Sequence, residues 1–227
     1  MTDRPGATGF SEQFVFPGLD VEPRPREEEP PARELPAGVA DYPELRYMGG
    51  KKRLLPWIHE VLSGLDFDSA FDPFSGSGAV AYLMKAMGKQ VTASDFLQFS
   101  ATVAEATIAN NQAQLDAADR EHLFGPAADD RDFIQRTYEG IFYNAADRAF
   151  LDRASANIDT LMDPGKQALA RASLIRAALK RQPRGVFTVS GDLSRYNDGR
   201  RDLRLSLEAH FQEQIQVFNG TVRDNGR

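Results

Sequence analysis

The 227-residue sequence contains no cysteine, which excludes disulfides, thiolate zinc sites and cysteine nucleophiles. Its three histidines (His59, His122 and His210) lie far apart, so we expect helix or surface positions for them and no metal site. No apolar run approaches the roughly 18 residues of a membrane span, and the first residues lack the apolar core of a signal peptide. With 41% hydrophobic residues the chain can still bury a sizeable core. These features predict a soluble, cytoplasmic protein without a membrane partner.

The net charge of -6 hides an uneven distribution. Residues 171–204 carry nine basic and three acidic residues, whereas acidic residues predominate before them. Because phosphate contacts are local, a basic stretch favours a nucleic-acid partner even in an acidic chain. The alternative is a solvated basic face.

Three regions are expected along the chain. Residues 1–40 hold seven of the thirteen prolines and many glutamates, which predicts a disordered or loosely docked tail. Residues 41–115 are expected to form a β-α-β-α region that binds a cofactor. Residues 116–227 are expected to be mainly helical and to carry the basic segment 171–204.

Hydrophobic patterning predicts the elements within these regions. We expect helices over 54–62, 79–87, 99–111, 168–180 and 205–218, and strands over 67–74, 91–93 and 186–190. Residues 191–204 are expected to form a polar, arginine-rich loop.

The central motif is S-A-F-D-P-F-S-G-S-G, from Ser69 to Gly78. It predicts a strand with Asp72 at its carboxyl end, a glycine turn and a helix. Asp95 follows 23 residues after Asp72, close to the spacing of an acid that binds ribose in a nucleotide crevice. Gly76 to Ala81 also fits the G-x-G-x-x-A dinucleotide fingerprint, so an NAD-type oxidoreductase remains an alternative.

Two features favour S-adenosylmethionine over NAD. Asp72 could accept a hydrogen bond from an ammonium group, whereas it would repel a pyrophosphate. Upstream, R-Y-M-G-G-K from Arg46 to Lys51 forms a glycine turn that offers N–H groups and positive charge to a carboxylate. Taken alone, this turn could also be an ordinary entry loop into the helix 54–62.

In this order, R-Y-M-G-G-K, D-P-F-S-G-S-G and A-S-D-F resemble the cofactor motifs of Dam-like adenine-specific DNA methyltransferases. The resemblance implies an α/β, Rossmann-like S-adenosylmethionine-dependent methyltransferase fold with a helical substrate-facing insertion, and double-stranded DNA as partner. It implies these cofactor-binding residues: Tyr47, Gly49, Gly50, Lys51, Asp72, Pro73, Phe74, Gly76, Gly78, Asp95 and Phe96, the last bordering the adenine.

The basic segment falls where this family places its substrate-facing region. The candidates for phosphate contacts are Lys180, Arg181, Arg184, Arg200 and Arg201. Tyr196 and Asn197 are candidates for positions nearer a base.

The family's catalytic tetrapeptide, Asp-Pro-Pro-Tyr or a variant with Asn or Ser first, does not occur among the 227 residues. We therefore assign no catalytic residue, and expect an incomplete sheet with an exposed edge and apolar faces. The chain is expected to be the N-terminal portion of a longer enzyme, or a half that needs a second chain. A non-catalytic half that binds cofactor or DNA remains the alternative to an adenine-specific DNA methyltransferase.

Overall fold

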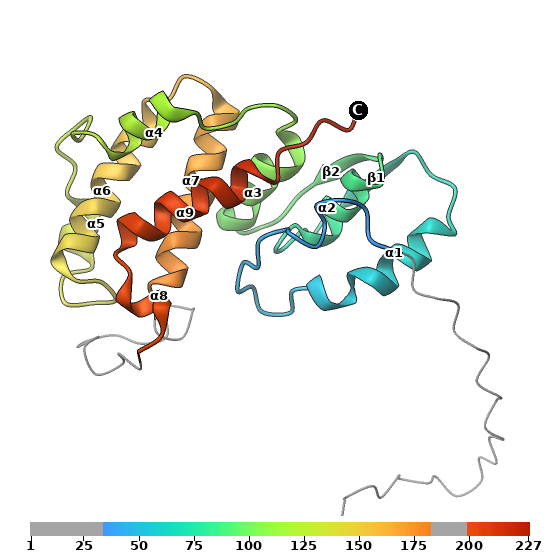
Figure 1. Cartoon of the computed structure of the whole chain (residues 1–227), viewed down its shortest axis with the longest axis horizontal. Coiled ribbons are helices and arrows are strands. Elements are labelled where there is room, and N and C mark those ends of the chain that lie inside the picture. Colours follow the sequence, from blue (N-terminus) through green and yellow to red (C-terminus); the bar gives the residue numbers. More distant parts are fainter. Residues whose placement is uncertain (1–33, 183–198) are drawn as a thin grey trace, which may run out of the picture. The chain divides into compact units, whose positions relative to one another are not determined.

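The computed structural model describes residues 34–182 and 199–227, in which two short parallel strands are accompanied by helices (Figure 1). The strands are β1 (Ser69–Asp72) and β2 (Gln90–Ala93). The helices before residue 110 are η1 (Lys52–Leu54), α1 (Leu55–Ser63), α2 (Ala79–Ala86), α3 (Gln98–Ala104) and the π-helix η2 (Glu105–Ala109). The helices after it are α4 (Ala117–Phe124), α5 (Phe133–Thr137), α6 (Ala145–Asp159), α7 (Pro164–Lys180), α8 (Arg201–Arg204) and α9 (Leu207–Asn219).

The β1-α2-β2 unit confirms the expected order of a strand, a glycine turn, a helix and a second strand. The strands pair in parallel, with Ser69 opposite Gln90 and Asp72 opposite Ala93. The strand expected over 67–74 is shorter than predicted, and Pro73 directly follows its last residue. Proline has no N–H to donate to a ladder, which accounts for the stop. The helix expected over 99–111 is divided between α3 and η2.

One face of this small sheet is bare in the part of the chain that is described. Val91 and Ala93 pack against the apolar cluster that α2 helps to form. Phe71 on β1 is 63% exposed, as expected for a sheet that lacks further layers. An outward apolar stripe at helical spacing runs along α1 and the residues beside its two ends, and it consists of Leu54, Trp57, Val61 and Leu65. Exposed apolar area of this kind favours association.

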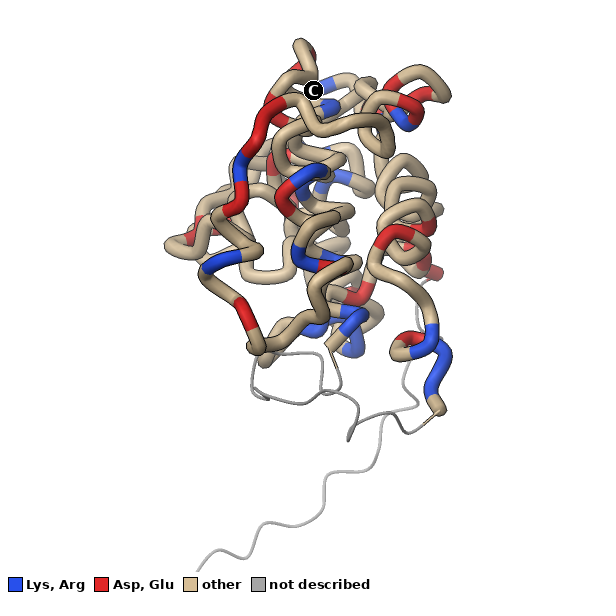
Figure 2. The backbone as a smooth tube through the Cα atoms, turned by 90° about the vertical axis from the view of Figure 1, so that its left-hand side faces the viewer, with Lys and Arg blue, Asp and Glu red and all other residues tan. Residues whose placement is uncertain are grey.

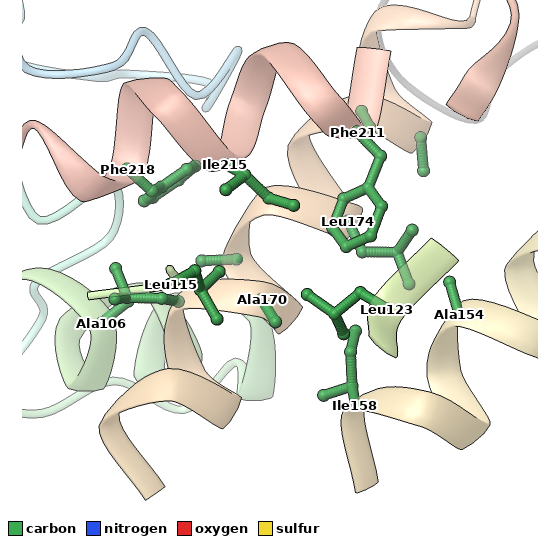
Figure 3. Close-up of a cluster of buried hydrophobic side chains, with 14 of the residues drawn as sticks. Ala106, Leu115, Leu123, Ala154, Ile158, Ala170, Leu174, Phe211, Ile215 and Phe218 are labelled. Atoms are coloured by element: carbon green, nitrogen blue, oxygen red, sulfur yellow. The ribbon is translucent and has the colours of Figure 1, made fainter. Parts of the chain in front are cut away.

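The helical region has its own core, shown in Figure 3. Helices α7 and α9 pack against each other, and Phe211, Ile215 and Phe218 of α9 are fully buried in a core to which α3, α4, α6 and α7 also contribute. Val103 of α3 belongs to this core, whereas Ala104 belongs to the cluster around α2. Helix α3 is therefore shared between the two cores, which joins the β-α-β unit firmly to the helical region.

Several expected boundaries differ from the structure. The helix expected over 168–180 begins at Pro164, because the Asp163 side chain caps it by accepting from the Gly165 and Lys166 N–H groups. The end of the loop expected over 191–204 forms α8. The strand expected over 186–190 lies outside the described residues. Within the tail expected over 1–40, Val39 is fully buried, so this part already belongs to the core.

Residues 220–227 run back onto the β-α-β unit. Tyr82 of α2 donates a hydrogen bond to the Thr221 carbonyl at 3.0 Å. The Asn225 amide donates to the Lys85 and Lys89 carbonyls at 3.2 and 2.9 Å, at and just beyond the end of α2. These contacts hold the end of α2 from a distant part of the sequence.

Two buried charged side chains support the helix ends. Lys85 is 2% exposed and donates to the Thr107 and Asn110 carbonyls at 3.2 and 2.7 Å, where η2 ends. Burial lowers the pKa of Lys85 to about 8. Asp152 is also 2% exposed and accepts from the Ile134 and Gln135 N–H groups at the start of α5, each at 2.9 Å. Among the described helices, none is long and apolar enough to cross a membrane.

Candidate cofactor site

The turn after β1 brings the candidate residues to the carboxyl ends of both strands. The Ser75 N–H donates to the Ser94 carbonyl at 3.0 Å, which ties the turn to the residue after β2. Gly76 and Gly78 have φ values of 53° and 74°, in the left-handed region that favours glycine. The Gly78 N–H donates to the Ser75 carbonyl at 2.7 Å and closes the turn, and α2 begins at the next residue.

Asp95 accepts two backbone hydrogen bonds at this edge. Its Oδ1 accepts from the Leu97 N–H at 2.9 Å and its Oδ2 accepts from the Gly76 N–H at 2.8 Å. These bonds, that from Leu97 foremost, hold the pKa of Asp95 below its ordinary value. Asp95 is therefore an ionised acceptor that links the glycine turn to the segment after β2.

Asp72 lies at the tip of β1 in a different environment. Burial raises the pKa of Asp72, the Phe74 N–H at 3.3 Å opposes this rise, and the negative charge of Asp95 adds to it. A cationic group placed beside Asp72 would relieve both the burial of its charge and the repulsion from Asp95. The site thus presents two carboxylates where a cationic ligand is favoured.

The upstream loop closes over the glycine turn. A methyl group at Gly76 would lie 3.1 Å from Cε1 of Tyr47, so the Tyr47 ring sits directly on this backbone. The Tyr47 ring also stacks on Phe99, with ring centres 6.4 Å apart. Within the loop the Gly50 N–H donates to the Tyr47 carbonyl at 3.1 Å, and Lys51 Nζ donates to the Gly49 carbonyl at 2.6 Å. The turn expected at Arg46 to Lys51 is therefore present and adjoins the strand ends.

These three segments line one pocket of about 680 Å³. The pocket brings together ten of the eleven sequence candidates: Tyr47, Gly49, Gly50, Lys51, Asp72, Pro73, Phe74, Gly76, Asp95 and Phe96. Phe96 is 99% exposed, so its ring is free to cover a ligand. The lining also includes residues that the sequence analysis did not select, namely Met48, Phe71, Ser75, Ser77, Ala79, Val80, Met84 and Leu97. These residues lie within or near the three motifs in the sequence, which is the feature that could have identified them as pocket residues.

Gly78 is the candidate that does not line this pocket. A methyl group at Gly78 would lie 2.6 Å from the Tyr42 hydroxyl, which donates to the Ser77 carbonyl at 2.8 Å. Tyr42 is 1% exposed. The absence of a side chain at Gly78 therefore makes room for the buried phenol that supports the turn from behind.

The candidates for DNA contact are already engaged where they are described. Lys180 pairs with Asp202 at 3.1 Å, Arg181 with Asp147 at 3.0 Å, and Arg201 with Glu213. Arg181 also donates to the Leu203 carbonyl. A DNA phosphate would have to compete with these carboxylates for the three cations.

The remaining DNA candidates are placed less fully. Arg200 directly precedes α8, and Arg184, Tyr196 and Asn197 lie outside the described residues. Figure 2 shows Lys and Arg positions gathered at the lower end of that view, where the tube passes into the grey trace. Across residues 34–182 and 199–227, no three acidic or histidine side chains gather as a metal site would require.

A family model for the D12 class N6 adenine-specific DNA methyltransferases matches residues 47–163, which is more than half of the chain. The chain belongs to this family. The match begins at Tyr47 of the upstream loop and includes the glycine turn and Asp95, so the G-x-G-x-x-A pattern is that of a D12 class methyltransferase. The alternative of an NAD-type oxidoreductase is thereby set aside.

The chain is also similar to the Type II methyltransferase M2.HphI of Haemophilus parahaemolyticus. The two are 33% identical over 196 residues, which is 82% of this chain and 58% of that relative. This chain thus spans little more than half the length of the curated relative it matches. No solved structure matches it.

Proposed function

We propose that this chain binds S-adenosylmethionine in the pocket at the ends of β1 and β2 and serves the methylation of adenine in DNA. The observation that carries the proposal is the convergence of ten motif residues, from three separate segments, on one pocket. Its volume of about 680 Å³ lies within the range of ~300–1,000 Å³ for small-molecule sites. The β1-α2-β2 unit is then the first part of a Rossmann-like methyltransferase sheet.

The chemistry of the pocket fits the parts of this cofactor. Asp95, ionised and already oriented by two N–H groups, would accept from the ribose hydroxyls. Asp72 would accept from the ammonium group and gain a neighbouring positive charge. Tyr47 would hold the turn over the glycines, while the 49–51 loop would face the carboxylate. Phe96 would cover the adenine ring.

When bound, S-adenosylmethionine supplies the methyl group that the exocyclic amine of adenine accepts. Enzymes that react with a base take it out of the stack, which requires contacts to the DNA on either side of it. The basic segment 171–204 is proposed to supply phosphate contacts of this kind. Methylation would then also need the family's Asp-Pro-Pro-Tyr function, which is not among these residues.

Cofactor binding is tested with Phe96→Ala and the matched control Phe133→Ala. Phe133 is also well exposed, at 63%, but lies outside the pocket. Because an aromatic contact to a base contributes ~1–3 kcal/mol, calorimetric titration should show S-adenosylmethionine binding weakened about fivefold or more by Phe96→Ala alone. Equal effects of the two substitutions, or preferential binding of NAD, would contradict the proposed site.

Methyl transfer is tested with labelled S-adenosylmethionine and unmethylated duplex DNA. Label on the adenine amino group is expected when the catalytic function is present, and label found only on protein or RNA would refute the proposal.

A second candidate function is a half enzyme that binds cofactor and DNA but needs a complementing chain for turnover. The bare sheet face with Phe71 and the apolar stripe on α1 favour it, because a further part would cover them. This candidate predicts that the isolated chain binds S-adenosylmethionine and binds DNA with steep salt dependence, but transfers no methyl group. Turnover by the isolated chain would exclude it.

A further inference from the structure

Arg46 is the first residue of the R-Y-M-G-G-K motif but is not among the cofactor-binding candidates, and its side chain joins two parts of the molecule. It directly precedes Tyr47 and has a φ of 45°, in the left-handed region that a residue with a side chain rarely adopts. This backbone turn sends the Arg46 guanidinium away from the pocket, whose lining includes Tyr47 but not Arg46. The side chain reaches the helical region instead.

There the guanidinium contacts two elements at once. Its Nη1 donates to the Leu179 carbonyl in the last turn of α7 at 3.2 Å. Its Nη2 donates to Asp202 Oδ2 in α8 at 3.0 Å. The last carbonyls of a helix lack partners within it and attract cations, so α7 favours the guanidinium. Arg46 thus links the end of α7 and helix α8 to the loop from Arg46 to Lys51.

Asp202 is shared between Arg46 and a candidate for DNA contact. Lys180 Nζ lies 3.1 Å from Asp202 Oδ1, while Arg46 takes the other oxygen. The Asp202 backbone carbonyl also accepts from His210 Nε2 at 2.8 Å, which anchors α8 on α9. A DNA phosphate that bound Lys180 would withdraw this cation from Asp202. The carboxylate would then interact more strongly with Arg46.

On the pocket side, the path continues through direct contacts. Arg46 is bonded to Tyr47, whose ring lies on Gly76. The Gly76 N–H in turn donates to Asp95, the proposed acceptor for the ribose. A change at Asp202 can therefore reach the cofactor pocket through three neighbouring residues.

We propose that Arg46 is a positioning residue that couples cofactor binding to DNA binding, through Asp202 on one side and Tyr47 on the other. Phosphate at Lys180 strengthens the Arg46–Asp202 pair, and the neighbouring Tyr47 is then held more firmly on Gly76. The coupling is therefore positive, which means that each ligand tightens the binding of the other. Thermodynamic linkage requires the same factor in both directions. The inference rests on the proposed cofactor and DNA sites.

The test uses the 227-residue chain and measures the affinity for S-adenosylmethionine by calorimetry with and without a short DNA duplex. In the unsubstituted protein, DNA should tighten cofactor binding about fivefold or more, the lower end of typical coupling. Arg46→Lys keeps the charge but cannot donate to Leu179 and Asp202 in the same geometry, so the factor should fall below about twofold. Asp202→Asn breaks the link from the other side and should have the same effect.

The matched control is Arg131→Lys. Arg131 is also paired with carboxylates, those of Asp129 and Asp159, and it lies outside the pocket, outside the basic segment 171–204 and away from Asp202. This variant should retain the full factor. A merely structural role for Arg46 would lower stability, measured by urea unfolding, without changing the ratio of the two affinities.

The outcomes separate this inference from the proposed function. Cofactor binding that is equally tight with and without bound DNA, or a full factor in Arg46→Lys, overturns the coupling but leaves the cofactor site in place. Failure of the unsubstituted chain to bind S-adenosylmethionine overturns the cofactor site and this inference with it. Failure to bind the duplex overturns the DNA site and the coupling, but leaves the proposed S-adenosylmethionine pocket unaffected.

Discussion

Replacement of Gly78 by alanine should destabilise the chain much more than the loss of a glycine in a left-handed turn. The backbone effect alone costs about 1 kcal/mol, because φ is 74°. The new methyl group would also lie 2.6 Å from the Tyr42 hydroxyl. Displacing this phenol leaves the Ser77 carbonyl without its partner, which costs a further ~1–3 kcal/mol. We expect a loss of about 3 kcal/mol in the free energy of unfolding.

The control for the backbone effect is Gly88→Ala. Gly88 has a φ of 79°, and a methyl group there would meet no atom within 4 Å. It should therefore cost only about 1 kcal/mol. A second background, Tyr42→Phe, removes the hydroxyl and leaves the ring carbon Cζ at an ordinary distance of 3.7 Å from the new methyl group. In that background Gly78→Ala should cost as little as Gly88→Ala.

Urea unfolding followed by circular dichroism measures all four variants, and the double-mutant cycle isolates the clash. A loss in Gly78→Ala no larger than that in Gly88→Ala would refute the reasoning. So would a cost of Gly78→Ala that is the same in both Tyr42 backgrounds. Either result would mean that the buried phenol does not constrain this turn.

Three further predictions concern buried charges and exposed apolar area. Burial lowers the pKa of Lys85 to about 8, so between pH 8 and 10.5 the unfolded chain binds more protons than the folded chain. The free energy of unfolding should therefore rise by ~1–3 kcal/mol from pH 8 towards 10.5. Urea unfolding midpoints should show this rise in the unsubstituted protein and lack it in Lys85→Met. Asp152→Ala removes the acceptor for two N–H groups at the start of α5 and should cost about 3 kcal/mol in urea unfolding, with faster amide exchange at Ile134. The double variant Trp57→Lys, Val61→Lys should reduce aggregation in light scattering without changing cofactor affinity, since neither side chain lines the pocket.

The candidate site could be predicted from sequence because its residues lie in short motifs with strong local rules. These rules act on the local backbone: glycine allows positive φ, proline ends a strand, and an acid follows the next strand. Asp72, Gly76 and Asp95 accordingly come together as expected. What the motifs could not reveal is that Gly78 accommodates Tyr42, a residue 36 positions earlier in the sequence.

The helical region was predicted less well, for a related reason. Its basic residues have partners that are remote in sequence, such as Asp147 for Arg181, which lies 34 residues away. A charge count over residues 171–204 cannot show these pairs. Likewise α8 has only four residues, too few for a recognisable period, and the buried His210 side chain holds it through the Asp202 carbonyl. Tertiary contacts, rather than local preference, determine these elements.

The return of residues 220–227 onto α2 has a consequence for how the protein folds. The hydrogen bonds from Tyr82 to Thr221 and from Asn225 to Lys85 span 139 and 140 residues of sequence. Contacts between such distant residues form slowly, because a long loop must close before they stabilise anything. The β1-α2-β2 unit therefore gains its hydrogen bonds with residues 220–227 only after α9 has been synthesised. Until residues 220–227 are present, the hydrogen bonds from Tyr82 and Asn225 cannot form, and the end of α2 lacks this support.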